Sequence, residues 1–327
     1  MEEPTPQRPG RRRGGARGRL RSRAFRRTRA LVMAACAAIL AVALGAGVHS
    51  AAQARSTAVV QSGSVTNSQA SVPASAASPA ATPAVSPTTP AAGAIDADLD
   101  AKINGIIDAN SDYQIGVALL DLSEGAEAAE TVHEYGVDAA FVAASTAKVL
   151  AAEAYYHLVE TGEASLGDPL GAYTAEFQLR AMIQQSDNDS WSLIMDAVGH
   201  EELTDYAASM GVDYSPESNT LTPADMAHIL AGLYSGTLLE PADTEQLLAY
   251  MQDTNYETLI PAAAPAGITV FHKYGLLGGE LHDAGILTQG GKAYALVVYT
   301  KGAGLGSVPE RTEVIHQVTE AVTDALF

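Results

Sequence analysis

The chain has 327 residues, a formal net charge of −19 and one cysteine, so intrachain disulfides are excluded. Its charge is unevenly divided: residues 1–30 hold eleven of the nineteen basic residues, whereas residues 95–327 hold seven basic and 36 acidic residues. An acidic domain of this kind repels polyanions, so we expect no nucleic-acid partner.

The N-terminal third begins with two segments typical of an exported protein. Residues 31–48 form an uncharged apolar run of eighteen, long enough to cross a bilayer as a helix. Arginines directly precede it, which predicts that residues 1–30 stay in the cytoplasm while the rest of the chain is exported. Ala52-Gln53-Ala54 offers a cleavage site. Two outcomes stay open: a single-pass membrane protein with an extracytoplasmic C-terminal domain, or a secreted protein after cleavage.

Residues 49–94 consist mainly of Ala, Ser, Thr, Pro and Val, with almost no charge and no aromatic residue. Such a composition cannot bury a core, so we expect a disordered linker. The remaining residues, 95–327, have the size of a single domain, which we expect to be monomeric.

Apolar periodicity predicts strands at both ends of this domain and helices between them. We expect helices over 95–107, 146–160, 176–185, 189–198, 201–210, 223–233, 244–252 and 309–327, and strands over 114–122, 130–135, 268–272, 281–288 and 293–300. This order predicts an α/β fold of the α+β type, in which both ends of the domain build one antiparallel sheet. Helices flank the sheet, and an all-helical lobe is inserted.

Ser145 and Lys148 stand three residues apart in an apolar stretch that we expect to open a helix. Positions i and i+3 share a helix face, so the hydroxyl and the amine can meet. A lysine shielded from water can take the proton of a serine nucleophile, and the helix N-terminus stabilises the developing negative charge. The pair alone is weak evidence, because a helix-capping serine beside a solvated lysine has the same sequence.

Two later motifs strengthen the assignment, namely Ser186-Asp187-Asn188 and Lys273-Tyr274-Gly275. Ser-x-x-Lys, Ser-Asp-Asn and Lys-Thr-Gly in this order are the signature of class A β-lactamases and penicillin-binding proteins. Residues 95–327 therefore resemble the penicillin-recognising serine hydrolases, and the fold just described is similar to theirs. Taken alone, Ser-Asp-Asn is an ordinary turn and helix cap.

The resemblance implies a role for each motif residue. Ser145 is the nucleophile, Lys148 its base, and Ser186 relays the proton to the leaving nitrogen. Lys273 faces Ser186 and helps to keep Lys148 unprotonated. For substrate binding the resemblance implies Asn188, Tyr274, Gly275 and Leu276, where Leu276 and Ser145 supply the N–H groups of an oxyanion hole. Asp187 is expected to bond local backbone.

Three departures from the family pattern matter. The loop 211–222 is much shorter than the family loop that carries the deacylating glutamate. Glu217 is the candidate for that role, and the alternative is that it lies in an exposed turn without a catalytic role. Tyr274 replaces the Thr or Ser hydroxyl that contacts a substrate carboxylate in the family. The strand after the glycines, residues 280–285, contains no arginine. Arg311, at the head of the last helix, could reach the site, but we expect it in a surface ion pair.

The sequence thus predicts an exported serine hydrolase, similar to β-lactamases or D,D-peptidases, that acylates Ser145 with β-lactams or peptidoglycan-derived peptides and deacylates slowly. Two alternatives stay open: a non-catalytic peptidoglycan-binding or β-lactam-sensing module, and a serine esterase or peptidase of altered specificity. We expect no cofactor. We also expect no metal, because neither His272 nor His282 has a partner at ligand spacing.

Overall fold

The computed structural model describes residues 95–123 and 131–327. The expected cytoplasmic segment 1–30, membrane or signal segment 31–48 and linker 49–94 all lie outside the described residues. Within the part of the chain that is described, none of the helices combines the length and the apolar character needed to span a bilayer.

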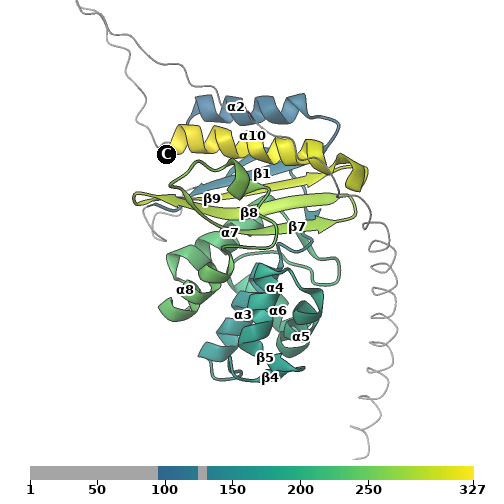
Figure 1. The fold of residues 1–327 in the computed structure, drawn as a ribbon, viewed down its shortest axis with the longest axis vertical. Helices are drawn as coiled ribbons and strands as arrows, with labels where there is room; N and C mark the ends of the chain where they lie inside the picture. Colours follow the sequence, from purple (N-terminus) through teal and green to yellow (C-terminus); the bar gives the residue numbers. More distant parts are fainter. Residues whose placement is uncertain (1–94, 124–130) are drawn as a thin grey trace, which may run out of the picture. The chain divides into compact units, whose positions relative to one another are not determined.

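Five antiparallel strands form the central sheet in the order β2-β1-β9-β8-β7 (Figure 1). The first two come from the start of the domain and the other three from its end, so the expected fold class is confirmed. The strands are β1 (Gln114–Asp121), β2 (His133–Gly136), β7 (Thr269–Leu277), β8 (Glu280–Gln289) and β9 (Lys292–Lys301). β7 lies at an edge of the sheet, where it has a ladder partner on one side only.

Helices cover both faces of the sheet. The first helix, α2 (Ala97–Ala109), and the last, α10 (Val308–Leu326), lie together on one face, and α7 (Pro223–Ser235) lies on the other with the helical lobe beyond it (Figure 1). The remaining helices are α3 (Lys148–Glu160), α4 (Ala175–Gln184), α5 (Asn188–Val198), α6 (His200–Ser209), α8 (Pro241–Tyr250), α9 (Ile260–Ala263) and the 3-10 turn η2 (Leu305–Ser307).

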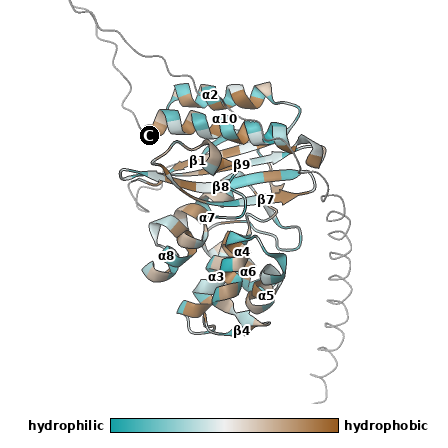
Figure 2. Ribbon diagram, in the orientation of Figure 1, coloured by the Kyte–Doolittle hydropathy of each residue, from teal (hydrophilic) through white to brown (hydrophobic). Residues whose placement is uncertain are grey.

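The apolar residues of the sheet alternate between two cores. On β9, Leu296 and Val298 pack with α2 and α10, whereas Val297 and Tyr299 point to the cluster shared with α7 and the lobe. Because successive side chains of a strand face opposite sides, a strand covered on both faces is apolar throughout. The helices show the complementary pattern, with polar stripes turned outward (Figure 2).

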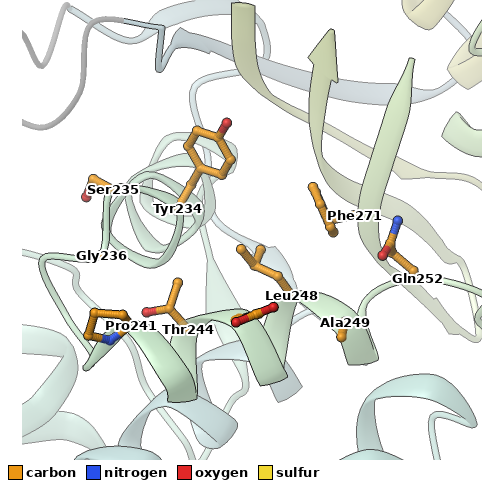
Figure 3. A pocket seen from close by; sticks show the side chains of 10 residues that line it. Tyr234, Ser235, Gly236, Pro241, Thr244, Leu248, Ala249, Gln252 and Phe271 are labelled. Atoms are coloured by element: carbon orange, nitrogen blue, oxygen red, sulfur yellow. The ribbon is translucent and has the colours of Figure 1, made fainter. Parts of the chain in front are cut away.

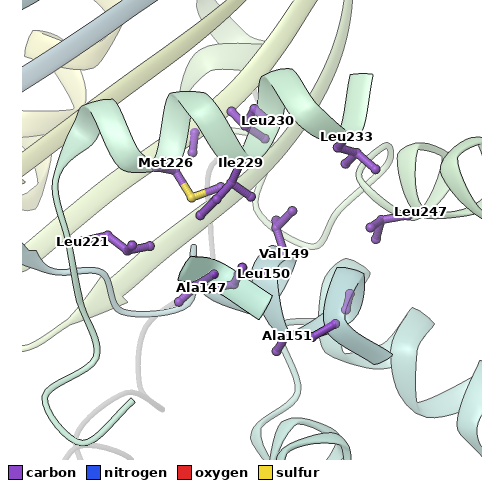
Figure 4. Packing of buried hydrophobic residues seen from close by; sticks show 14 of the residues in the cluster. Ala147, Val149, Leu150, Ala151, Leu221, Met226, Ile229, Leu230, Leu233 and Leu247 are labelled. Atoms are coloured by element: carbon purple, nitrogen blue, oxygen red, sulfur yellow. The ribbon is translucent and has the colours of Figure 1, made fainter. Parts of the chain in front are cut away.

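α3 is the central helix of the lobe, and its residues 148–156 are all buried. Its apolar side chains Val149 and Leu150 lie below Met226, Ile229 and Leu233 of α7 (Figure 4). Apart from Lys148 and Glu153, these buried residues are apolar, and a helix that is apolar on nearly all sides is stable only inside a protein. A lysine that opens such a helix is therefore carried into a dry environment.

Several predicted element boundaries differ in the structure, and a few short elements were not predicted. α3 begins at Lys148 rather than at residue 146, because the preceding residues form a tighter turn. β7 continues to Leu277, five residues beyond the expected end, because its pairing with β8 extends to the hairpin turn. α9 and two short strand pairs were not predicted: β3 (Phe141–Val142) with β6 (Thr220–Leu221), and β4 (Pro169–Leu170) with β5 (Tyr173–Thr174).

Candidate active site

Ser145 lies in a tight turn between β3 and α3. The amides of Thr146 and Lys148 donate to the carbonyls three residues earlier, Ala143 and Ser145, at 3.1 and 3.3 Å. Ala144, directly before the serine, has a φ of 52°. This left-handed conformation costs a residue with a side chain roughly 1–2 kcal/mol. The surrounding hydrogen bonds hold the strained turn, which leaves Ser145 partly exposed among buried neighbours.

Strand β7 passes close to this turn at Gly275. A Cβ atom at position 275 would lie 3.0 Å from the Ala143 carbonyl oxygen and 3.3 Å from the Ser145 nitrogen. Real Cβ atoms rarely approach backbone atoms so closely, so a side chain here would push the strand and the serine turn apart. The glycine is therefore needed for close approach of the backbones.

The edge position of β7 leaves alternate N–H groups free of the sheet ladder. The amide of His272 points away from β8 and donates to the Met251 carbonyl at 2.8 Å. Because strand groups alternate with a period of two, the amide of Leu276 points to the same open side. Gly275, directly before Leu276, passes close to the Ser145 nitrogen, which keeps the amides of Ser145 and Leu276 as the expected oxyanion donors.

Lys148 is buried at the start of α3, where its amine meets the second motif. Its Nζ donates to the Ser186 carbonyl at 2.7 Å, to Asn188 Oδ1 at 2.8 Å and to Ser186 Oγ at 3.3 Å. Burial lowers the pKa of Lys148 to about 7, although the charge of Asp187 opposes the shift. At neutral pH a large share of these amines is unprotonated, which is the form that can accept a proton; Ser145 Oγ is not among the hydrogen-bond partners of Nζ, which are Ser186 and Asn188.

The second motif is a strained turn that leads into α5. Ser186 has a φ of 52°, which directs its carbonyl toward the lysine. Asp187 is the N-cap of α5, because its carboxylate accepts from the Ser190 amide at 2.6 Å. The prediction that Asp187 bonds local backbone is confirmed, and the cap holds its two neighbours, Ser186 and Asn188, against Lys148.

Lys273 is completely buried. Its Nζ donates to the Tyr274 carbonyl at 3.1 Å and lies 4.0 Å from the Tyr274 ring centre. Burial lowers the pKa of Lys273 well below its usual value, and the charge of Lys148 lowers it further. Burial is thus the main cause of the lowered pKa of Lys148, and the repulsion between the two lysines adds to the lowered pKa of Lys273.

The short loop 211–222 brings its asparagine to the site but not its glutamate. Asn219 Nδ2 donates to the Ala144 carbonyl at 3.0 Å, and the Ala143 amide donates to the Asn219 carbonyl at 2.8 Å. The Glu217 side chain is 76% exposed, and its Oε1 lies 3.6 Å from Nδ1 of His200. The loop thus supports the serine turn, while Glu217 points to an ion pair at the surface.

Tyr274 and its neighbour Asn255 form the rim of the site. The Tyr274 hydroxyl donates to Asn255 Oδ1 at 3.0 Å. Burial raises the pKa of the Tyr274 phenol, and a hydrogen bond with the Ser186 side chain opposes this rise. Sequence reasoning missed Asn255 because it stands in a loop between α8 and α9 without a motif. Only its position beside Tyr274 reveals its role.

Arg311 is an internal support of the fold, so the expected surface ion pair is wrong. Its guanidinium is fully buried and donates to the carbonyls of Gly279 at 2.6 Å, Gly304 at 3.1 Å and Thr300 at 3.2 Å. It thereby fixes the hairpin turn between β7 and β8. An arginine can fill this role because its five N–H donors fan out in one plane.

The two histidines near the site are buried in different environments. His272 contacts Asp283 and Glu257, and His282 Nε2 contacts the Val142 carbonyl at 2.9 Å. Within residues 95–123 and 131–327, no group of three or more His, Cys, Asp or Glu side chains is arranged to hold a metal ion.

A separate hollow of about 640 Å³ opens between the end of α7, α8 and the start of β7 (Figure 3). One of its lining residues, Phe271, stands two positions before Lys273 on β7. The residues that line it are Tyr234, Ser235, Gly236, Pro241, Thr244, Glu245, Leu248, Ala249, Gln252 and Phe271. The three catalytic motifs are not among them, so this hollow is distinct from the serine site.

The sequence model of the beta-lactamase enzyme family matches residues 98–326, which span all three motifs and the sheet. The chain belongs to this family. The resemblance inferred from the motifs is thereby confirmed, and a serine hydrolase of the beta-lactamase type is the activity that the family supports in general.

Solved structures of similar proteins agree with this assignment. PBP-A is 26% identical, with a TM-score of 0.63, over 70% of this chain and 96% of that one. A PBP-A mutant in an acyl-enzyme complex with penicillin G is 27% identical, with the same TM-score and coverage. A mutant class A beta-lactamase of the last common ancestor of Gram-negative bacteria is 25% identical, with a TM-score of 0.63, over 69% of this chain and 98% of that one.

Proposed function

We propose that this beta-lactamase family member is a serine acyl-enzyme with β-lactams or peptidoglycan-derived peptides as substrates. The observation that carries the proposal is the buried amine of Lys148, with a pKa of about 7, three residues after Ser145 in a strained turn. As Ser145 Oγ adds to the substrate carbonyl, Lys148 accepts its proton. The C–N bond then breaks, and the proton passes through Ser186 to the leaving nitrogen, which gives an ester on Ser145.

Release of the acyl group is the slow step of this proposal. Hydrolysis of the ester needs a base that activates water. Glu217, the sequence candidate, has an exposed carboxylate beside His200, and the loop contributes Asn219 to the serine turn instead. This geometry supports a long-lived acyl-enzyme, as in a D,D-peptidase or a β-lactam sensor, rather than rapid β-lactam hydrolysis.

Incubation with a fluorescent penicillin, followed by intact-mass measurement, tests the proposal. The expected result is one adduct per chain that persists after the free label is removed. Ser145→Ala is the matched control, because it removes one oxygen and leaves the turn in place. Absence of label on the wild type, or equal label on Ser145→Ala, refutes acylation. Rapid loss of the adduct refutes slow deacylation.

Export belongs to the same proposal, because the substrates lie outside the cytoplasm. The basic segment 1–30 and the apolar run 31–48 support either a membrane anchor or a cleaved signal peptide. Fractionation of cells that express the full chain, with protease added from outside, distinguishes these states. Protection of residues 95–327 in intact spheroplasts contradicts export.

A further inference from the structure

The side-chain amide of Asn255 has only one possible orientation. One end of it lies 3.0 Å from the Gln185 carbonyl oxygen, which can accept a hydrogen bond but cannot donate one. The NH₂ group must therefore point to Gln185, and Oδ1 must point to the Tyr274 hydroxyl, 3.0 Å away. Because Oδ1 only accepts, the Tyr274 proton is directed at Asn255.

The loop that carries Asn255 is held in place at several points. The Asn255 amide donates to the Gln184 carbonyl at 2.9 Å, next to the second motif. The preceding residue, Thr254, donates to Glu257 Oε1 at 2.6 Å through both its amide and its hydroxyl. Glu257 also contacts buried His272, at 3.1 Å. These contacts fix the backbone of the loop at Asn255, and rotation of the Asn255 side-chain amide would place Oδ1 against the Gln185 carbonyl oxygen, so the direction of the Tyr274 proton is built into the loop.

The Tyr274 oxygen therefore presents lone pairs to the active site. The Ser186 side chain lies near enough to the phenol to influence its pKa, and Ser186 Oγ in turn contacts Lys148 Nζ at 3.3 Å. The phenol is half-buried, so a ligand in the site can reach it. A ligand group that donates a hydrogen bond is attracted by these lone pairs, whereas a carboxylate oxygen is repelled.

The nearby cations do not offset this repulsion at the rim. Lys273 is completely buried and Lys148 is 2% exposed, so neither amine reaches the surface that a ligand meets first. The amine of Lys148 is already engaged by Ser186 and Asn188. Arg311, which contacts Gly279 in the β7–β8 turn, is buried among backbone carbonyls.

We infer that Tyr274, oriented by Asn255, is a specificity-determining residue that selects substrates with a neutral hydrogen-bond donor, an amide N–H or a hydroxyl, where it contacts them, and disfavours a carboxylate there. The inference rests on the proposed acyl-enzyme function and narrows its substrate class to uncharged or amidated acyl donors. Asn255 is a positioning residue, because it acts only through the phenol.

A matched set of three compounds tests the inference: benzylpenicillin, its methyl ester and its primary carboxamide. The three compounds share the ring system and the side chain. They differ only at one position, which carries a carboxylate, a methyl ester or a carboxamide. We expect the second-order rate constant for acylation of Ser145 to be highest for the carboxamide. It should exceed the rate constant of the free acid about 10-fold or more, because a hydrogen bond or repulsion that involves a charged group changes binding by at least that factor. An equal or faster reaction of the free acid overturns the inference.

Variants at the rim separate orientation from general stability. In Asn255→Leu the Tyr274 hydroxyl can turn and donate to a carboxylate, so the preference for the carboxamide should shrink about 10-fold. In Tyr274→Phe the side chain has neither a hydrogen-bond donor nor an acceptor. The preference for the carboxamide should therefore also be lost, but the acylation rate of the free acid should not rise. Thr258→Ala, an exposed change in the same loop, is the control and should keep the wild-type ranking. An unchanged ranking in Tyr274→Phe overturns the inference.

Binding to Ser145→Ala distinguishes failure of this inference from failure of acylation. If none of the three compounds labels the wild type, the proposed acyl-enzyme function is refuted. Calorimetric titration of Ser145→Ala with the same compounds then decides the selectivity of the site alone. The role of Tyr274 is supported if the carboxamide binds most tightly. It is overturned if the free acid binds most tightly or if none of the three compounds binds.

Discussion

His272 makes the stability of this domain depend on pH in a direction that can be measured. Its ring is completely buried between two carboxylates: Nδ1 lies 2.8 Å from Asp283 Oδ1 and Nε2 lies 3.1 Å from Glu257 Oε1. Burial alone would lower the pKa of His272, but the charges and hydrogen bonds of Asp283 and Glu257 outweigh it and raise the pKa to about 9. The folded protein therefore holds an imidazolium at neutral pH.

The size of the effect follows from this pKa. The folded value of about 9 exceeds the ordinary value of 6.5 by some 2.5 units, and each unit corresponds to about 1.36 kcal/mol. His272 thus contributes up to about 3 kcal/mol to the free energy of unfolding. This contribution is fully present below pH 6.5 and is lost as the pH rises through 9. For a domain with a total stability of roughly 5–15 kcal/mol, the loss is readily detected.

The titration of Lys148 changes the stability with pH in the opposite direction to that of His272. Measurements on the wild type alone therefore cannot isolate the contribution of His272. Its folded pKa of about 7 lies below the ordinary 10.5, so the unfolded chain binds more protons between these values and stability rises with pH. Lys273 acts in the same direction. The informative quantity is therefore the difference in unfolding free energy between the wild type and His272→Gln, because the lysine contributions cancel in it.

Urea unfolding at pH 6, 7.5 and 9.5, followed by circular dichroism, measures this difference. We expect His272→Gln to be less stable at pH 6, and the gap to shrink by about 3 kcal/mol by pH 9.5. Stability curves that stay parallel over this pH range would refute a charged His272 in the folded state.

Three further predictions concern the site and its support. The acylation rate should rise with pH through about 7, as Lys148 loses its proton, and this step should disappear from the single-turnover pH profile of Lys148→Arg. Gly275→Val should slow acylation by about 10²–10³-fold, because its Cβ displaces the strand from the Ser145 turn; rates within a few-fold of wild type would contradict the close approach. Arg311→Leu should lower the free energy of unfolding by about 3–5 kcal/mol, measured in urea, because buried carbonyls lose their donors; a change under 1 kcal/mol would argue against this role.

Much of the fold could be predicted because its signals are local. The strand β9 stands out as a long apolar run between glycines, and Pro223 after a threonine marks the start of α7. The three motifs could be found because each consists of residues adjacent in sequence. The short pairs β3–β6 and β4–β5 could not be found, because two residues carry no periodicity and their partners lie far along the chain.

The sequence by itself determined which residues belong to the candidate site. The serine, the two lysines and the asparagine of the motifs can be identified from the sequence, and so can the tyrosine that departs from the family pattern. Only the tertiary structure decided how they are charged and oriented. The pKa of Lys148 depends on burial by helices from elsewhere in the chain, and Glu217 faces solvent because of the way its loop turns. The proton of Tyr274 points to Asn255 because a carbonyl from another loop leaves that amide no other orientation. Desolvation and hydrogen-bond direction arise from contacts between distant segments, so no local pattern encodes them.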